Sequence, residues 1–301
     1  MLSIVFCLAS TAFGQETTGD LEGYVKDPTG AVVPNVSVTI VSAQNSENTT
    51  RTSVAVGFRR TLTTSEEGFF RALQIPPGIY TVTTEPTAGF GAATYTNVNV
   101  SVGRVTQLDI ALTVGSAGTN TVNVTTTEDA IDPTGSQIQK NITAREIETI
   151  PSGVSFSSLL RLSPSTRPET KSGGFQIDGA SGSENSFIID GQDVSNFKSN
   201  NLDAVNNIPT FLVQEVSVKT SGFDAEFGGA TGGVISVVTK GGSNAWRGLF
   251  GVEFDTPRLN ASPRPTLART SDPSTANGNR AEYLNFAKNG GTDFFPTAQV
   301  S

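Results

Sequence analysis

Carboxylates are the main side chains of this chain that could do chemistry. The acidic candidates gather in its second half and are Asp190, Asp193, Asp203, Asp224 and Glu226. The segment Asp190-Gly191-Gln192-Asp193 offers oxygen ligands of the kind that bind Ca²⁺, and paired carboxylates can hydrolyse glycosidic bonds. The spacing completes no EF-hand loop, and it singles out no acid and nucleophile. A turn closed by Asx hydrogen bonds is therefore the favoured interpretation.

Other common catalytic side chains are missing from the sequence. The chain has no His and a single Cys, Cys7, which removes His-based triads and His metal ligands. We therefore expect no enzyme, no catalytic or metal site and no cofactor, although a secreted hydrolase that uses carboxylates stays open as a rival. The net charge of -8 argues against a nucleic-acid partner, because such partners need clustered cations.

The first residues have the pattern of a secretory signal peptide. An apolar run from Leu2 to Ala9 is too short to span a bilayer, and Ala12-Phe13-Gly14 places small residues before a cut at Gln15. We predict a signal peptide over residues 1–14, although no Lys or Arg precedes the apolar run. The alternative is a buried N-terminal strand. No later stretch approaches the 18 apolar residues of a transmembrane helix.

Residues 17–114 alternate between apolar and polar positions, as half-buried strands do. The apolar positions of four such strands are Leu21, Gly23 and Val25; Val36, Val38 and Ile40; Val98, Val100 and Val102; and Leu108, Ile110 and Leu112. Turn signals such as Asp27-Pro28-Thr29-Gly30 and Pro76-Pro77-Gly78 separate the strands. Several short strands at this spacing predict a β-sandwich.

Residues 131–242 predict a second domain of α+β type. Thr143 and Glu146 form the pattern of a capping box, and the helix that they begin must stop before Pro151. Ser155 is a candidate cap for a second helix, which Pro164 would close. The expected strands follow at residues 175–177, 186–189, 213–218 and 234–239.

Two further segments flank the second domain. Residues 115–130 form a linker, which begins with small and polar residues typical of flexible chain. Residues 246–254 alternate like a first barrel strand, with Trp246, Phe250 and Phe254 on one side. Residues 257–301 lose this periodicity, and we interpret them as a long surface loop.

Three separated motifs of the first domain resemble a known family. They are GYVKDPTGAVVPNV at residues 23–36, TTSEEGFF at 63–70 and LQIPPGIYTV at 73–82. Together they resemble the carboxypeptidase-regulatory-like domain, a transthyretin-like or Ig-like β-sandwich that is classed among carbohydrate-binding-like folds. The resemblance implies such a sandwich over residues 17–114. A structural spacer and a glycan-binding module both remain open as its role.

Four segments of the second domain resemble the plug domain of TonB-dependent outer-membrane receptors. They are IETIP with FSSLL at residues 147–160, FQIDGA with FIIDGQDV at 175–194 (read as paired strands), VQEVSVKT at 213–220 and FDAEFGGATGGVISVVTKGG at 223–242. Two departures are Asp178, where Arg is common, and Thr220-Ser221-Gly222 in place of the usual "kGp". The domain order resembles the Oar-like subgroup of transporters.

The resemblance implies a mechanism and a set of residues. Thr121, Val122, Asn123 and Val124 resemble the TonB box, which an energy-coupling protein captures by adding a strand; a last strand of the sandwich explains them equally well. The turns expected to build the plug involve Asp190, Gly191, Gly228, Gly229, Gly232 and Gly233. In the family, the plug blocks a barrel in the outer membrane and gates uptake of a scarce ligand. Plug and sandwich then lie on the periplasmic side.

The length of the chain limits this interpretation. Plugged transporters need about 22 strands, and fewer than sixty residues follow Gly242. We therefore expect the N-terminal part of a longer transporter, with residues 243–301 as the start of a truncated barrel. The alternative is a secreted carbohydrate-binding or adhesive β-sandwich protein without transport activity. The ligand, a small molecule or a glycan, is not identified by the plug sequence.

Overall fold

The computed structural model of the chain describes residues 17–42, 57–87, 89–115, 120–123, 137–150, 152–169, 174–223, 227–241, 248–256, 265–270, 280–284 and 291–300. The expected signal peptide, Val124, Asp224, Glu226 and Trp246 lie outside the described residues. The chain divides into two compact units, Met1–Asn244 and Ala245–Ser301. Among the described helices, none is long and apolar enough to cross a membrane.

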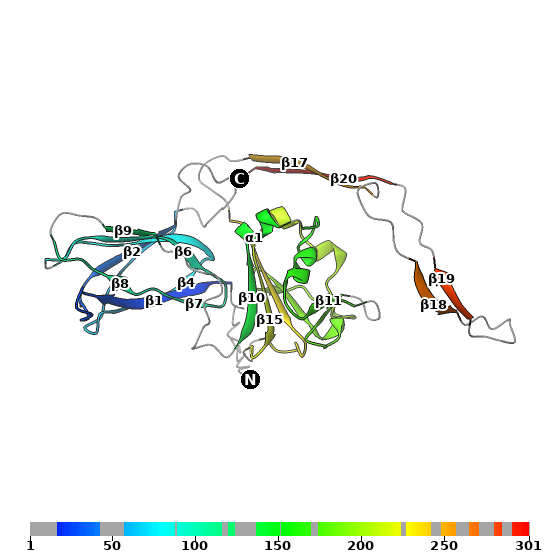
Figure 1. The fold of residues 1–301 in the computed structure, drawn as a ribbon, viewed down its shortest axis with the longest axis horizontal. Coiled ribbons are helices and arrows are strands. Elements are labelled where there is room, and N and C mark those ends of the chain that lie inside the picture. Colours follow the sequence, from blue (N-terminus) through cyan, green and yellow to red (C-terminus); the bar gives the residue numbers. More distant parts are fainter. Residues whose placement is uncertain are drawn as a thin grey trace, which may run out of the picture. The chain divides into compact units, whose positions relative to one another are not determined.

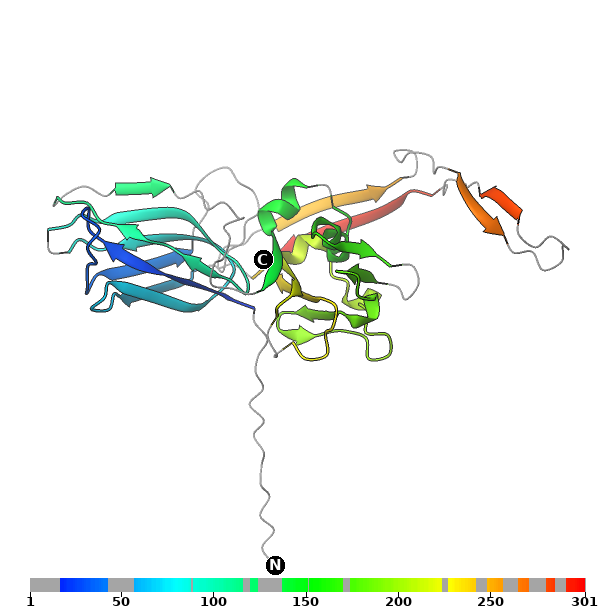
Figure 2. The same cartoon turned by 60° about the horizontal axis from the view of Figure 1, so that its bottom comes forward.

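The first part of unit one is a β-sandwich of two sheets (Figures 1 and 2). One sheet has the order β4-β1-β7, and β8 also pairs with β1. Its strands are β1 (Gly19–Lys26), β4 (Phe69–Ile75), β7 (Val105–Gln107) and β8 (Ile110–Ala111). The other sheet has the order β3-β2-β5-β6-β9. Its strands are β3 (Arg59–Thr63), β2 (Ser37–Ser42), β5 (Gly78–Thr84), β6 (Ala93–Val100) and β9 (Asn120–Asn123).

Alternate residues of these strands form the core between the two sheets, as the sequence predicts. Buried members include Leu21, Val25, Val38, Ile40, Val82, Val98 and Ile110. Tyr80 is buried with them, and its hydroxyl donates a hydrogen bond to the Pro76 carbonyl at 2.6 Å. Burial raises the pKa of the Tyr80 hydroxyl far above its ordinary value. The prediction of a sandwich is confirmed.

The second part of unit one is built on a five-stranded sheet of order β10-β15-β16-β13-β14. Its strands are β10 (Ile138–Thr143), β15 (Val213–Ser221), β16 (Val234–Thr239), β13 (Ser186–Ile189) and β14 (Gln192–Asp193). The described residues of this domain also form a two-stranded sheet of β11 (Thr166–Pro168) and β12 (Phe175–Ile177) and the helix α1 (Ala144–Thr149). They further include the 3₁₀ helices η1 (Phe156–Leu162), η2 (Gly182–Glu184), η3 (Ala204–Asn206) and η4 (Thr210–Leu212).

One face of this sheet carries the apolar core of the domain. Val216 and Val218 of β15 and Ile235 and Val237 of β16 share one cluster with residues of α1 and η1. The capping box at the start of α1 is present, since Thr143 Oγ1 accepts from the Glu146 N–H and the Glu146 carboxylate accepts from the Thr143 N–H. The helix ends at Thr149, before Pro151, as predicted.

Two details of this domain differ from expectation. The expected second helix is present as the 3₁₀ helix η1, which begins after Ser155 and ends before Pro164, but Ser155 makes no side-chain cap; its hydroxyl lies instead 3.3 Å from the Ser157 hydroxyl. The strand at residues 175–177 does not pair with the strand at 186–189. It pairs with β11, because β13 takes β16 and β14 as its neighbours.

The described residues of unit two form two antiparallel strand pairs. β17 (Gly248–Asp255) pairs with β20 (Asp293–Val300), and β18 (Thr266–Thr270) pairs with β19 (Arg280–Leu284). The expectation of a long loop over residues 257–301 is therefore wrong. Pro296 broke the strand pattern in the sequence, yet it lies opposite Val252 in a two-stranded pair, where an edge position tolerates the missing donor. Phe250 and Phe254 are exposed in this strand pair.

Candidate functional site

The segment that resembles a TonB box forms the outermost strand of the sandwich. In β9, Thr121 pairs with Thr94 of β6, Val122 with Tyr95 and Asn123 with Thr96. The fourth candidate position, Val124, lies outside the described residues. In this conformation the segment is therefore a sandwich strand, which was the second interpretation that the sequence left open.

The geometry of β9 suits a strand that changes partners. It spans four residues and lies at the end of its sheet in the described part of the chain. It runs parallel to β6, whereas the other pairs of that sheet are antiparallel. Parallel pairing is slightly less stable per residue, and short extended segments are what a partner captures by β-augmentation.

The Asp190-Gly191 turn joins β13 to β14 and also reaches β16. Asp190 has φ 48° and Gly191 has φ 80°, and Ile189 pairs directly with Gln192. Two positive φ values in a two-residue hairpin loop are typical of a type I′ turn, which Asp-Gly favours. The Asp190 carboxylate accepts from the Thr239 N–H at 2.9 Å and from the Thr239 hydroxyl at 2.7 Å. The turn therefore fixes the ends of two neighbouring strands.

The described acidic candidates use their oxygens in separate turns. Asp193 accepts from the Ser195 N–H at 2.8 Å, and Asp203 accepts from the Asn196 amide at 2.8 and 3.0 Å. Within the described residues, no group of three or more acidic, His or Cys side chains is placed to hold a metal ion. The hydrogen bonds of Asp190 and Asp193 are those of structural turns.

Close packing surrounds two of the four glycines of the signature before β16. A Cβ atom on Gly232 would lie 2.6 Å from Asn185 Oδ1, and one on Gly233 would lie 2.6 Å from Ile177 Cδ1. Gly229 has a different constraint, since its φ is +94° and its surroundings are open. Gly228 lies in the same exposed turn. The backbone thus approaches η2 and β12 more closely than a side chain permits.

Asn185 organises this region, and sequence reasoning missed it. It is fully buried; its Oδ1 accepts from the Gly233 N–H at 2.9 Å, and its Nδ2 donates to the Phe175 carbonyl. The glycine strand, η2 and β12 are thereby joined through one side chain. The sequence did contain a signal for this turn, because Ser181 and Glu184 form a capping box immediately before Asn185.

The two folds and these turns define the chain as a sandwich module followed by a receptor plug. Residues 20–113 match the family model of the carboxypeptidase regulatory-like domain. Residues 131–234 match that of the TonB-dependent receptor plug domain. The chain therefore carries both domains, in the order that the sequence motifs indicate.

The chain is also similar to a curated transporter. The chain is 28% identical over 226 residues to the TonB-dependent transporter Oar of Myxococcus xanthus. The match covers 70% of this chain and 20% of the relative, so the chain spans about a fifth of the length of that protein.

Similar solved structures include a siderophore receptor and an outer membrane transporter. The siderophore receptor PirA of Acinetobacter baumannii is 22% identical, with 38% of this chain and 19% of that chain covered and a TM-score of 0.32. The outer membrane transporter YddB of Escherichia coli is 26% identical, with 38% and 18% covered and a TM-score of 0.33.

Proposed function

We propose that this chain is part of a TonB-dependent outer-membrane transporter, in which the plug gates energy-coupled uptake of a scarce ligand. Residues 1–14 direct export, and the sandwich and plug work on the periplasmic side of the outer membrane. The transported ligand is a small molecule or a glycan. The plug match over residues 131–234 and the similarity to a TonB-dependent transporter support the proposal.

The observation that carries the proposal is the position of β9. A coupling protein needs an extended segment that it can pair with, close to the plug that it must move. Residues 120–123 form a short strand at a sheet edge, and the plug sheet begins at Ile138. In this mechanism the segment 121–124 leaves β6 and adds to a sheet of the TonB-type protein, which then pulls on the plug.

The plug turns have a mechanical role in this scheme. Asp190 bonded to Thr239 and Gly232 and Gly233 packed on Asn185 and Ile177 hold β13 and β16 together as a parallel pair. We assign these residues to plug architecture. They let the sheet move as one body when force arrives, because the turns restrict how its strands can separate.

Site-specific disulfide trapping tests the proposal. In a Cys7→Ser background the chain has no other Cys, so single Cys residues at positions 121, 122, 123 and 124 can be paired with Cys residues in the periplasmic domain of the coupling protein. We expect cross-links at these positions, with yields that alternate because successive side chains of a strand point to opposite faces.

Thr94→Cys is the matched control, since Thr94 lies on β6 directly beside Thr121. If the coupling protein captures β9 and no other strand, the Thr94→Cys variant should form no cross-link with it. Equal yields at position 94 and at positions 121–124, or no cross-link at any of the four, would contradict the proposed coupling.

A further inference from the structure

The turn that joins β6 to β7 is buried against the plug. This turn, which we call the docking turn, comprises Ser101–Arg104, and Val102 in it is 1% exposed. The Val102 N–H donates to Glu215 Oε1 of β15 at 3.0 Å. The Val102 carbonyl accepts from Asn141 Nδ2 at 2.9 Å and from Gln139 Nε2 at 3.1 Å. Plug side chains therefore bind both backbone polar groups of Val102.

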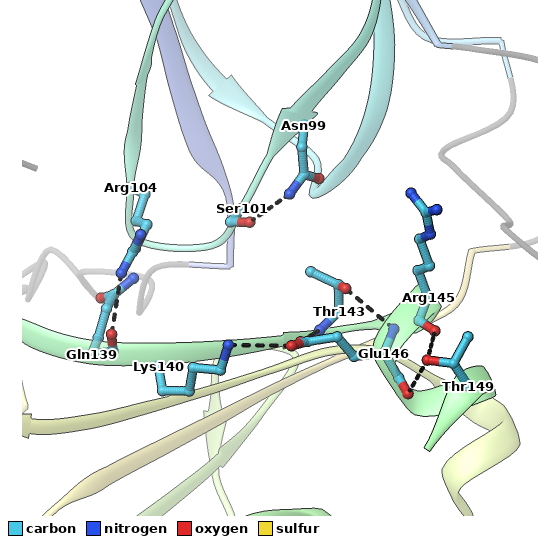
Figure 3. A network of polar contacts seen from close by, with 9 residues as sticks. All are labelled: Asn99, Ser101, Arg104, Gln139, Lys140, Thr143, Arg145, Glu146 and Thr149. Atoms are coloured by element: carbon cyan, nitrogen blue, oxygen red, sulfur yellow. Dashed lines mark hydrogen bonds and ion pairs between the residues drawn. The ribbon is translucent and has the colours of Figure 1, made fainter. Parts of the chain in front are cut away.

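A further contact runs in the opposite direction. Arg104 Nη2 donates to the Gln139 carbonyl at 3.1 Å, as Figure 3 shows. Sandwich and plug thus each supply side chains that bind the backbone of the other. Such reciprocal bonds fix the position of the turn along β10, because a shift by one residue would break them together.

The plug residues that receive the turn are linked to one another. Asn141 Nδ2 also donates to Glu215 Oε1, and Asn141 Oδ1 accepts from Gln139 Nε2 at 2.9 Å and from the Ser217 hydroxyl at 3.4 Å. Asn141 pairs with Ser217 in the β10–β15 ladder. The polar side chains therefore lie on one face of two neighbouring strands, opposite the face of Val216 and Val218, which belong to the apolar core.

Glu215 explains why this face needs a partner. Its side chain is 3% exposed, and a carboxylate in such a place is strongly unfavourable unless hydrogen-bond donors surround it. The Val102 N–H is one of its donors and comes from a residue 113 positions away. Without the turn, the carboxylate would lose that donor. The polar face of β10 and β15 is thus complementary to the backbone polar groups of the docking turn.

We propose that the docking turn is a second attachment of the sandwich to the plug, independent of the chain that connects β9 to β10, with Glu215 and Asn141 as its receptor. The partner of this surface is the sandwich of the same chain. The docking rests on this geometry alone. One consequence rests on the proposed function: β6 also pairs with β9, so capture of residues 121–124 would leave the sandwich bound to the plug.

Residue-resolved hydrogen exchange of the whole chain tests the docking. We expect Glu215→Ala to speed exchange of the Val102 amide at least tenfold, because that amide loses its acceptor. Gly103 is an internal reference, since its N–H donates to Thr18 within the sandwich at 3.0 Å. Its exchange and that of Val218, in the centre of the plug sheet, should not change. Glu215→Gln keeps an acceptor oxygen and should restore most of the protection.

Lys140→Ala is the matched control on β10, because Lys140 pairs with Glu146 inside the plug at 3.2 Å and is expected to leave Val102 unaffected. If Val102 stays as protected in Glu215→Ala as in the unaltered chain, the proposal is wrong. If Val218 also loses protection in Glu215→Ala, the plug itself has been damaged, and the exchange of Val102 is measured in Arg104→Ala instead. Faster exchange at Val102 but not at Val218 in that variant supports docking. Unchanged exchange at Val102 overturns the proposal. The cross-linking of residues 121–124 can fail without affecting this result.

Discussion

Asn185 and Gly233 are joined by a hydrogen bond of 2.9 Å from the glycine N–H to the amide oxygen. The same oxygen would lie 2.6 Å from a Cβ atom on Gly232. The buried Asn185 amide thus leaves no room for a side chain at position 232. The same amide binds the backbone N–H of Gly233. Asn185 therefore explains the glycine at position 232, whereas Ile177 of β12 occupies the space that a side chain at position 233 would need.

The close packing of Ile177 on Gly233 predicts that Gly233→Ala destabilises the plug. A new Cβ would meet Ile177 at 2.6 and 2.9 Å, and such overpacking typically costs ~1–3 kcal/mol. Urea unfolding should show a lower midpoint for the second domain. Gly241→Ala is the control, because nothing lies within 4 Å of its Cβ position. Equal midpoints for the two variants would show that the packing around Gly233 yields without cost.

A second prediction concerns Asp190. Asp190→Ala removes both hydrogen bonds to Thr239. It also places Ala at φ 48°, where Asp and Asn are tolerated because their side chains can form local hydrogen bonds. We therefore expect the free energy of unfolding to fall by about 2 kcal/mol. Asp190→Asn should lose less, because Asn keeps an acceptor and tolerates this backbone region. Thermal unfolding of the two variants measures the difference. If Asn is as harmful as Ala, the negative charge, rather than the geometry, is what the turn requires.

The start of α1 gives a third prediction. Thr143→Ala removes the cap that binds the Glu146 N–H, and loss of such a cap typically costs ~1 kcal/mol. Thr149→Ala is the comparison: its hydroxyl donates to carbonyls of Arg145 and Glu146 at the exposed end of the same helix (Figure 3). Chemical denaturation should find the second variant within about 0.5 kcal/mol of the unaltered chain. The reverse order would contradict the assignment of the cap.

A fourth prediction is a pH dependence in the sandwich. The Asp27 carboxylate accepts from the Thr29 hydroxyl at 2.7 Å and from the N–H groups of Thr29 and Ala31. These bonds, led by that from the Thr29 side chain, hold the pKa of Asp27 below its ordinary value of 3.8. The folded state therefore binds this proton less readily than the unfolded state does.

Asp27 thus contributes stability that is present above pH 3.8 and is lost as the pH falls through the lower folded-state pKa. Unfolding of the chain and of Asp27→Asn should be compared from pH 6 downward. We expect the advantage of the unaltered chain to shrink in acid. A constant difference at all pH values would show that the carboxylate charge makes no contribution.

Local signals predicted much of this fold. The Thr143 capping box, the stop before Pro151 and the Asp190-Gly191 turn depend on residues within a few positions of one another, so the sequence reveals them directly. Alternation identified β1, β2 and β6 of the sandwich, because each has one face in the core. It did not identify β3, in which no residue is buried, and it failed at β20, where Pro296 interrupts the pattern. The helix pattern after Ser155 predicted a helix but not its 3₁₀ geometry.

Long-range contacts could not be predicted from these patterns. Asn185 meets Gly233 across 48 positions, and Glu215 meets Val102 across 113. The alternation of VQEVSVKTS places Glu215 on the polar face of its strand, but the sequence shows neither that this face is buried nor which donors the carboxylate finds there. The pairing of β9 with β6 depends likewise on a fold that is already complete.

The contact between the docking turn and the plug limits the sequence changes that each of the two domains tolerates. The plug binds the turn through the N–H and carbonyl of Val102, which nearly every amino acid can supply, whereas the plug side needs a carboxylate and an amide. Replacing Val102 by another apolar residue of similar size should therefore keep these hydrogen bonds, whereas substitutions at Glu215 or Asn141 remove them. A foreign sandwich with a turn of the same shape could be grafted onto this plug, while this sandwich would be rejected by a plug that lacks the two side chains.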